Sequence, residues 1–176
     1  RQADGDGVSN VTLRDLIRTS LRMRPDRIIV GEVRGEEALD MIQSMNTGHD
    51  GSLSTGHANS PQDMLSRLET MALFASDIPI QAIRKQIASS IDIIVQLERL
   101  RDRSRRVTAI AEVLDCTEDA YILNPIFEFH EQDNLVMESS SYGDIPERVV
   151  GQLERTGYHL MHRRKLHAAA LESAEI

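Results

Sequence analysis

The sequence predicts an α/β protein, and three observations support this class. A short aliphatic run over residues 27–33 is followed by a helical pattern and then by a second extended segment, residues 51–55. A strand, a crossover helix and a strand make a βαβ unit, whose two strands run parallel. Further along, two runs rich in β-branched residues flank an arginine-rich turn, which predicts an antiparallel hairpin.

Composition restricts the class of protein. The chain has 176 residues and a formal charge of −8, which allows one or two domains and argues against a general nucleic-acid binder. No apolar run approaches the ~18 residues of a membrane span. One cysteine, Cys116, excludes an internal disulfide and fits a reducing compartment. Because initiator Met and signal peptide are both missing, we expect a fragment of a longer cytoplasmic protein.

The positions of the lysines show whether the sequence contains a phosphate-binding loop. Only two of the 20 cationic side chains are lysines, Lys85 and Lys165, and neither follows a glycine. The Gly-x-x-x-x-Gly-Lys-Ser/Thr loop that cradles nucleotide phosphates is therefore absent from this sequence. Nucleotide chemistry would need a phosphate loop outside it.

A first helix is predicted from Thr12, which forms a capping-box pattern with Asp15, to the residues before Pro25. Three cations recur on it at four-residue intervals: Arg14, Arg18 and Arg22. Like charges so placed repel by roughly 0.2–0.5 kcal/mol per pair, so we expect acidic partners. Two interpretations stay open: a solvated face paired with nearby Asp and Glu, or a contact with another subunit or a phosphate.

The aliphatic run 27–33 predicts a strand buried on both faces of a parallel sheet, with Glu32 where it ends. The next helix has acidic residues in its first turn and Gly48 at its C′ position. Segment 51–55 is polar for a core strand, and its hydroxyls would lie beside a ligand or a neighbouring strand end. These hydroxyls belong to Ser52, Ser54 and Thr55.

The remaining elements follow in order. A helix should start with Ser60 as N-cap, Pro61 at N1 and Asp63 at N3, where its carboxylate can bond back to the N-cap. It should end at residues 76–79. A short helix over 80–87 should precede a strand at 91–97, an exposed arginine-rich tip at 99–106 and a strand at 107–113. Beyond Asp115 we expect an appendage of short strands (121–123, 126–129 and 135–137) and a ragged helix from 146. The histidines of that last segment are interpreted as surface residues rather than zinc ligands: His159, His162 and His167.

Two side chains predict a site. Glu32 and His57 each follow a predicted strand, and parallel strands end at one sheet edge, where open α/β sheets bind ligands. Such a carboxylate can orient a water that attacks a γ-phosphate. His57 could donate to that phosphate or to Glu32, and Arg34 could neutralise phosphate or pair across an interface. Spacing alone leaves the alternative open that Glu32 is a surface residue and His57 a structural one.

Two long motifs resemble the type II/IV secretion-system ATPase superfamily, with the best match in its tight-adherence (Flp-type) pilus branch. They run from Leu21 to Gly35, with Glu37–Asp40 after them, and from Met45 to Leu53, with Thr55 and His57–Pro61 after them. The resemblance covers about residues 12–115. It implies the carboxyl-terminal half of a RecA-like P-loop ATPase domain, a parallel sheet with flanking helices, followed by a hairpin and a small tail over residues 116–176.

On this resemblance Glu32 falls on the Walker B glutamate and His57 on the histidine of the His box, with Arg34 and Thr55 beside the nucleotide. The family implies ATP and Mg²⁺, a cytoplasmic homohexamer and an inner-membrane platform protein as partner, with no nucleic acid expected.

Two departures matter: Gly56 replaces a bulky aliphatic residue, which would loosen the strand end, and the upstream acidic box and Walker A loop are missing. We expect the whole protein to be an ATPase and this chain alone to be inactive. A DNA-translocating motor and a non-catalytic interaction module remain the alternatives.

Overall fold

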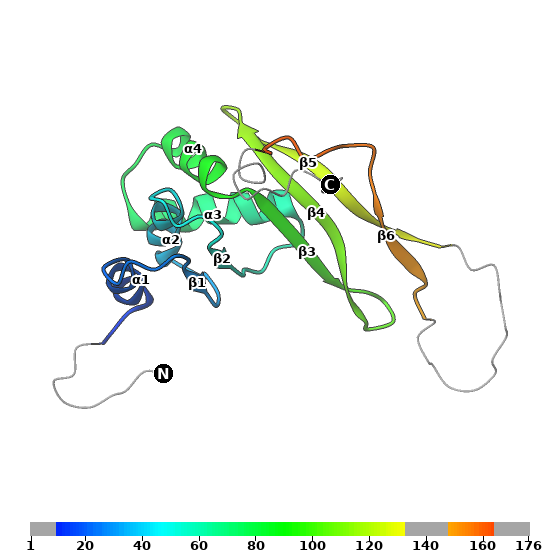
Figure 1. Ribbon diagram of the computed structural model, residues 1–176, viewed down its shortest axis with the longest axis horizontal. Coiled ribbons are helices and arrows are strands. Elements are labelled where there is room, and N and C mark those ends of the chain that lie inside the picture. The colour runs from blue at the N-terminus through cyan, green and yellow to red at the C-terminus, as the bar shows by residue number, and fades with distance from the viewer. Residues whose placement is uncertain (1–9, 133–147, 164–176) are drawn as a thin grey trace. The chain divides into compact units, whose positions relative to one another are not determined.

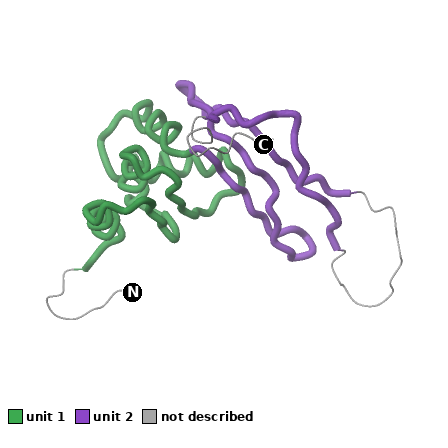
Figure 2. The backbone as a smooth tube through the Cα atoms, in the orientation of Figure 1, with its two compact units in different colours: residues 1–91 green, residues 92–176 purple. Residues whose placement is uncertain are grey.

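The computed structural model describes residues 10–132 and 148–163, and its chain forms two compact units, residues 1–91 and 92–176 (Figure 2). The first unit mixes helices with a short parallel sheet, and the second contains an antiparallel sheet (Figure 1). The α/β class is thereby confirmed. The domain boundary expected after residue 115 falls inside a strand of the second unit.

The first unit contains four helices and two short strands in its described part. In chain order they are α1 (Leu13–Leu21), β1 (Ile29–Val30), α2 (Glu37–Met45), β2 (Leu53–Ser54), α3 (Pro61–Ala75) and α4 (Ile80–Ser90). β1 and β2 pair in parallel, as the βαβ pattern predicts, with Ile29 opposite Leu53. The buried core comes mainly from one side of each helix, for example Ile42, Leu65, Leu68, Ile83 and Ile87.

The expectation of a strand buried on both faces is wrong for β1. Ile28 and Val30 are buried, but the side chain of Ile29 between them is 73% exposed. Successive side chains of a strand point to opposite faces, and in the described residues this sheet has only two strands. Nothing in the described part of the unit covers the face on which Ile29 lies.

Local capping signals predicted helix starts correctly. Thr12 and Asp15 form the complete capping box of α1, and the Ser60 hydroxyl accepts from the Asp63 N–H at 3.0 Å at the start of α3. The end of α2 differs slightly from expectation. Asn46 is its C-cap, so Gly48, with φ of +91°, lies one position beyond C′. The left-handed conformation that favours glycine therefore occurs one residue later in the turn.

The arginines of α1 have acidic partners on α2. Asp40 is buried, and its two carboxylate oxygens accept from Arg14 Nε at 2.5 Å and Arg18 Nε at 2.9 Å. Arg14 also contacts Glu36 at 3.1 Å. For Arg14 and Arg18 the interpretation as cations paired with nearby carboxylates is confirmed, and their repulsion is offset within the unit.

In its described residues the second unit forms a four-stranded antiparallel sheet in the order β3-β4-β5-β6. Its strands are β3 (Ile93–Arg99), β4 (Arg105–Cys116), β5 (Tyr121–Glu131) and β6 (Gly151–Arg155). The predicted hairpin is confirmed as β3 and β4. It is not separate from the predicted tail, however, because β5 pairs along β4.

Two predictions beyond residue 115 are wrong. Residues 121–131 form one strand rather than two short pieces, because a register shift between Ile110 and Ala111 accommodates Pro125. Residues 151–155 form strand β6 rather than part of a helix. A Cβ on Gly151 would lie 2.5 Å from the His130 carbonyl oxygen, so glycine permits this close pairing with β5. The strand predicted at 135–137 lies outside the described residues.

A buried carboxylate on β4 links the second sheet to the segment that follows β6. Glu112 on β4 is 1% exposed and accepts from Asn124 Nδ2 at 2.9 Å and from the N–H groups of Met161 and His162 at 2.9 and 2.7 Å. Because several donors satisfy its oxygens, burial of this charge is tolerated. These bonds fix the segment around residue 161 to the centre of the sheet.

Candidate functional site

The candidate site is the turn that follows β1. Gly31–Gly35 leave the strand, and two sets of bonds hold them. The Val33 N–H donates to the Thr55 carbonyl at 3.1 Å, and the Thr55 hydroxyl donates to the Gly31 carbonyl at 2.5 Å. Hydrogen bonds between the two chain segments therefore continue beyond the ends of β1 and β2, although without regular strand geometry.

The other side of the turn is held by the start of α2. A carboxylate oxygen of Glu37 accepts from the N–H groups of Arg34 and Gly35 at 2.7 and 3.1 Å. These two N–H groups belong to the residues just before the N-cap Glu36, and one carboxylate satisfies both donors of the turn. The backbone around Glu32 is thus fixed from two directions.

The structure brings Glu32, Arg34 and His57 together. Glu32 Oε2 lies 2.5 Å from an Arg34 terminal nitrogen, and Glu32 Oε1 lies 3.1 Å from His57 Nε2. The Glu32 side chain is 23% exposed, whereas those of Arg34 and His57 are 74% and 80% exposed. The expected meeting of Glu32 and His57 at one sheet edge is therefore present, and the two partners of Glu32 are largely open to solvent.

The charges around Glu32 keep it ionised. The hydrogen bond from Arg34 lowers the pKa of the Glu32 carboxyl below its ordinary value, and the nearby positive charges act in the same direction. The same contact raises the pKa of Arg34. A carboxylate held in this way can accept a hydrogen bond from a water at neutral pH once one of its present partners moves.

Thr55 and Ser52 hydrogen-bond to the backbone of the neighbouring strand and its turn. The Ser52 hydroxyl accepts from the Ile28 N–H at 2.9 Å, and Thr55 bonds to Gly31. Of the two interpretations of the hydroxyls in segment 51–55, these contacts support the neighbouring-strand one. Both residues help to position the Glu32 turn.

Sequence reasoning missed Arg67. This exposed side chain on α3 donates from a terminal nitrogen to the His57 carbonyl at 2.7 Å, and its charge also lowers the pKa of Glu32. Its position ten residues after His57, inside a helix, carries no local signal. Glu37 was recognised only as a favourable charge in a first helical turn, and its bonds to the Glu32 turn were not anticipated.

Gly56 leaves room for a methionine. A Cβ at residue 56 would lie 2.8 and 2.6 Å from the sulfur and methyl carbon of Met64. The Met64 side chain thus occupies the space in which the resemblance leads us to expect a bulky aliphatic residue. This contact offsets part of the looseness expected at the strand end.

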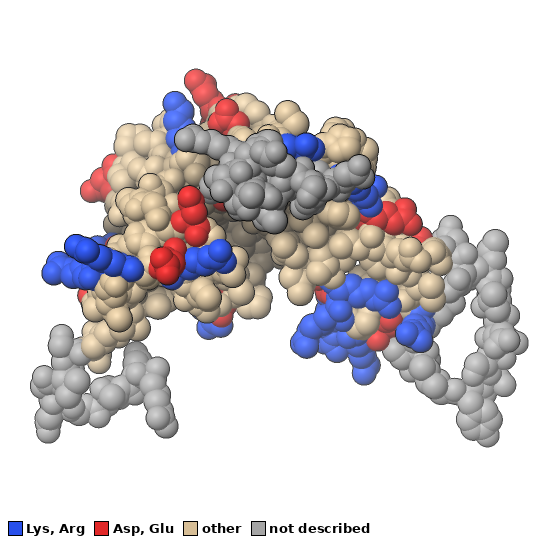
Figure 3. All heavy atoms as spheres, viewed as in Figure 1, with Lys and Arg blue, Asp and Glu red and all other residues tan. Residues whose placement is uncertain are grey.

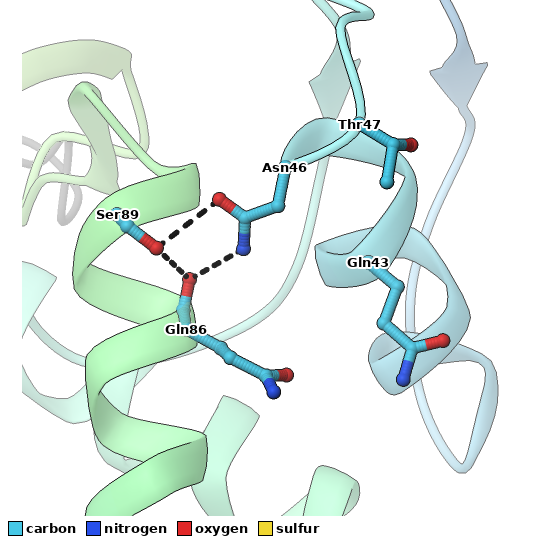
Figure 4. Close-up of a pocket in the computed structure, with 5 residues that line it drawn as sticks. All are labelled: Gln43, Asn46, Thr47, Gln86 and Ser89. Carbon is cyan, nitrogen blue, oxygen red and sulfur yellow. Dashed lines mark hydrogen bonds between the residues drawn. The ribbon is translucent and has the colours of Figure 1, made fainter.

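The first unit also has a polar hollow of about 450 Å³ (Figure 4). Its lining contains only amide and hydroxyl side chains: Gln43, Asn46, Thr47, Gln86 and Ser89. Asn46 Nδ2 donates to the Gln86 carbonyl at 3.0 Å, and Ser89 bonds to both residues, which ties α2 to α4. Without a titratable side chain, this hollow offers no acid or base to activate its hydroxyls.

The described residues contain neither a metal centre nor a membrane-spanning helix. Within the described residues, no group of three His, Cys, Asp or Glu side chains is placed to hold a metal ion. His162 Nδ1 lies 3.5 Å from Glu112, and His167 lies outside the described residues. The described helices include none with the length and apolar character that crossing a membrane requires.

Comparisons with known proteins identify relatives of part of this chain. A candidate conjugal transfer protein of Mycobacterium tuberculosis is 40% identical over 111 residues, 63% of this chain and 31% of that protein. The type IV secretion system protein PtlH of Bordetella pertussis is 38% identical over 99 residues, 54% of this chain and 29% of that protein. The chain thus spans less than a third of the length of these relatives.

A solved structure shares the fold of part of the chain. The VirB11 ATPase from the Brucella suis type IV secretion system, in complex with sulphate, matches with a TM-score of 0.55 and 33% identity. The match covers 58% of this chain and 32% of that one. The family described as type II/IV secretion system protein matches residues 2–141. The chain therefore belongs to the type II/IV secretion system protein family.

Proposed function

We propose that this chain is part of an ATPase that powers protein secretion or pilus assembly, and that it contributes the catalytic edge of a RecA-like domain. The observation that carries the proposal is the contact of Glu32 with His57 at 3.1 Å, made across the ends of two parallel strands. Family membership and the likeness to an ATPase structure support it.

Each residue of the site receives a role in this proposal. Glu32 orients the water that attacks the γ-phosphate, because its carboxylate is ionised and fixed in position. His57 contacts either Glu32 or the phosphate. Arg34 now pairs with Glu32, and a phosphate would compete for its guanidinium, which would leave the carboxylate free for water. Thr55 contributes by holding the turn, and its oxygen can still accept a bond from a nucleotide.

The residues present fit a triphosphate only in part. Arg34 and Arg67 place positive charge near Glu32, which suits the terminal phosphate of ATP. The sequence lacks the glycine-rich lysine loop, so the other phosphates need residues beyond this chain. The described residues do not by themselves fit Mg²⁺, because no set of ligands converges among them.

The assembly follows from the family rather than from any contact in this chain. We propose that the whole protein works as a homohexamer on the cytoplasmic side of the inner membrane, docked on a platform protein. The sequence motifs predict that the protein belongs to the tight-adherence pilus branch of the family. In each copy the phosphate loop would come from the part of the same protein that precedes this chain.

The decisive experiment is the substitution Glu32→Gln in the whole protein. It removes the charge but keeps the shape, so we expect ATP turnover to fall at least about a hundredfold while nucleotide binding stays near the wild-type level. Glu128→Gln, the same change at an exposed residue of β5, is the matched control. Wild-type turnover by Glu32→Gln would remove Glu32 from the mechanism.

A second measurement tests the split site. Calorimetry on the 176-residue chain should show weak ATP binding or none, because the phosphate loop is missing from the sequence. Submicromolar binding would mean that the nucleotide site has been misplaced.

One alternative keeps specific support. Relatives named as conjugal transfer proteins, such as TrbB of Rhizobium radiobacter, which is 39% identical over 103 residues, favour a motor that serves DNA transfer. Direct DNA translocation would appear as salt-sensitive DNA binding by the whole assembly. The formal charge of −8 argues against that outcome.

A further inference from the structure

His57 lies in a segment of the first unit that strand pairing does not hold. β2 ends at Ser54, and Thr55 makes the bonds that continue the strand pair. Gly56 then precedes His57, and glycine leaves the backbone freer than any other residue does. The contact of His57 with Glu32 at 3.1 Å therefore needs support from another element.

Helix α3 gives that support from its first two turns. The Met64 side chain lies against Gly56, since a Cβ at residue 56 would be 2.6 Å from the Met64 methyl carbon. One turn later, a terminal nitrogen of Arg67 donates to the His57 carbonyl at 2.7 Å. Residues three apart lie on one face of a helix, so Met64 and Arg67 contact the two successive residues from the same side.

The contact of Arg67 differs from those of other arginines in the first unit. Figure 3 shows blue and red side chains next to one another on the face of this unit that it presents, and four of its arginines pair with carboxylates: Arg14, Arg18, Arg34 and Arg84. Asp63 lies four residues before Arg67, a spacing at which opposite charges commonly pair on a helix. In the described structure the two form no ion pair, and the Arg67 guanidinium bonds to the His57 backbone instead.

The charge of Arg67 also acts on Glu32. It lowers the pKa of the Glu32 carboxyl, in the same direction as the hydrogen bond from Arg34, which is the larger cause. Arg67 thus bonds to the backbone of one site residue and acts by its charge on the other. It is close to both members of the pair formed by Glu32 and His57.

The packing of α3 does not depend on Arg67. Leu65 and Leu68 of this helix are 0% and 3% exposed, and Glu69 pairs with Arg84 in the interior. Arg67 itself is an exposed residue. We therefore expect a neutral substitution of Arg67 to leave the fold nearly unchanged, so that an effect on turnover would arise at the site.

We propose that Arg67 is a positioning residue of the candidate site, which holds the His57 backbone so that the imidazole meets Glu32. This role rests on the proposed function, in which Glu32 orients the attacking water. Because Arg67 donates to a backbone carbonyl, the His57 imidazole can exchange Glu32 for a phosphate oxygen while its backbone stays fixed. A displacement of about 1 Å at such a site can lower a rate roughly a hundredfold.

Turnover by the whole protein gives the first test. We expect Arg67→Gln to lower kcat about tenfold or more and to leave the KM for ATP within about threefold, because positioning acts on the chemical step. Arg67→Lys keeps the charge and a donor, so it should restore part of the loss. Lys85→Gln removes a positive charge from an exposed residue of α4, and as the control it should retain wild-type turnover. The urea midpoints of all three variants should match that of the unaltered protein.

A spectroscopic test needs no turnover. In the 176-residue chain with isotopically labelled histidine, His57→Gln identifies which of the six histidine ring signals belong to His57. Glu32→Gln should shift those signals, since it removes the charge beside His57 Nε2. If Arg67 holds the pair together, that shift should fall by at least about half in an Arg67→Gln background. It should keep its full size in a Lys85→Gln background.

The outcomes separate this role from the proposed function. Wild-type kcat in Arg67→Gln, or an undiminished response of His57 to Glu32→Gln, would overturn the role of Arg67 even where Glu32→Gln abolishes turnover. Wild-type turnover by Glu32→Gln would instead reject the proposed function, and the histidine signals alone would then decide whether Arg67 positions His57. A loss of kcat accompanied by a lowered urea midpoint in both Arg67 variants would show that Arg67 serves the fold rather than the site.

Discussion

Arg84 on α4 and Glu69 on α3 form a two-point ion pair in the interior of the first unit. Arg84 Nε lies 2.5 Å from Glu69 Oε1, and a terminal nitrogen of Arg84 lies 3.1 Å from Oε2. Both side chains are about nine-tenths buried. Two charges removed from water in this way are tolerated only together.

Removing one partner should therefore be costly. We expect Arg84→Met to lower the free energy of unfolding by about 3–5 kcal/mol, because the Glu69 carboxylate is left buried without its cation. Replacing both, with Glu69→Leu added, should restore most of the loss. Urea unfolding followed by helical circular dichroism measures this, with exposed Lys85→Met as control. A loss below about 1 kcal/mol would show that Glu69 finds another partner.

The Arg34 contact should control ionisation at the candidate site. Arg34→Ala removes the hydrogen bond that most lowers the pKa of Glu32, so that pKa should rise toward its ordinary value. Arg67→Ala should raise it less, since only the charge of Arg67 acts on Glu32. Carboxyl carbon NMR titration measures both shifts. An unchanged pKa in Arg34→Ala would mean that the pair does not form in solution.

The hairpin tip should loosen in acid. The Asp102 carboxylate accepts from the Ser104 hydroxyl and N–H and from the Val149 N–H, and these bonds lower its pKa from 3.8 to about 2. A lowered pKa means that the stabilisation is complete above pH 3.8 and is lost as pH falls through about 2.

Amide hydrogen exchange at Ser104 and Val149 follows this change. Exchange should accelerate as pH drops across that window, after correction for the intrinsic rate. Asp102→Asn should exchange rapidly at every pH and lose the transition. Protection that stays constant as pH falls through that window in the unaltered chain would contradict the assignment of these bonds.

The opposed arginines of the hairpin should respond to charge reversal. Arg99→Glu replaces a repulsive pair with an attractive one opposite Arg105, so we expect the free energy of unfolding to rise by about 0.5 kcal/mol. The gain should shrink in molar salt, which screens exposed charges. Destabilisation by Arg99→Glu would indicate that Arg99 already has a partner.

Features set by neighbouring residues were predictable from the sequence. The caps at Thr12 and Ser60 depend on residues three positions away, and both helices begin where the caps place them. The parallel pairing of β1 and β2 followed from one short βαβ unit. The contact between Glu32 and His57 was expected for the same reason, because both residues follow strands of that unit.

Features set by distant residues were not predictable. Gly151 belongs to a strand because β5 lies beside it, and nothing within a few residues of it indicates that pairing. Pro125 resembled a break between strands, yet a register shift in the neighbouring strand admits it. Arg67 reaches His57 only after α3 folds back along the turn. Each of these features depends on a partner residue that lies outside the local sequence pattern.

Glu112 gives the second unit a defined path for mechanical force. The N–H groups of Met161 and His162 are held by a buried carboxylate in the middle of β4 rather than at the sheet's outer strand. Tension applied to the chain beyond residue 163 would reach the central strands before it could peel β6 from β5. A force applied there would therefore load the sheet through β4, which pairs with a strand on each side.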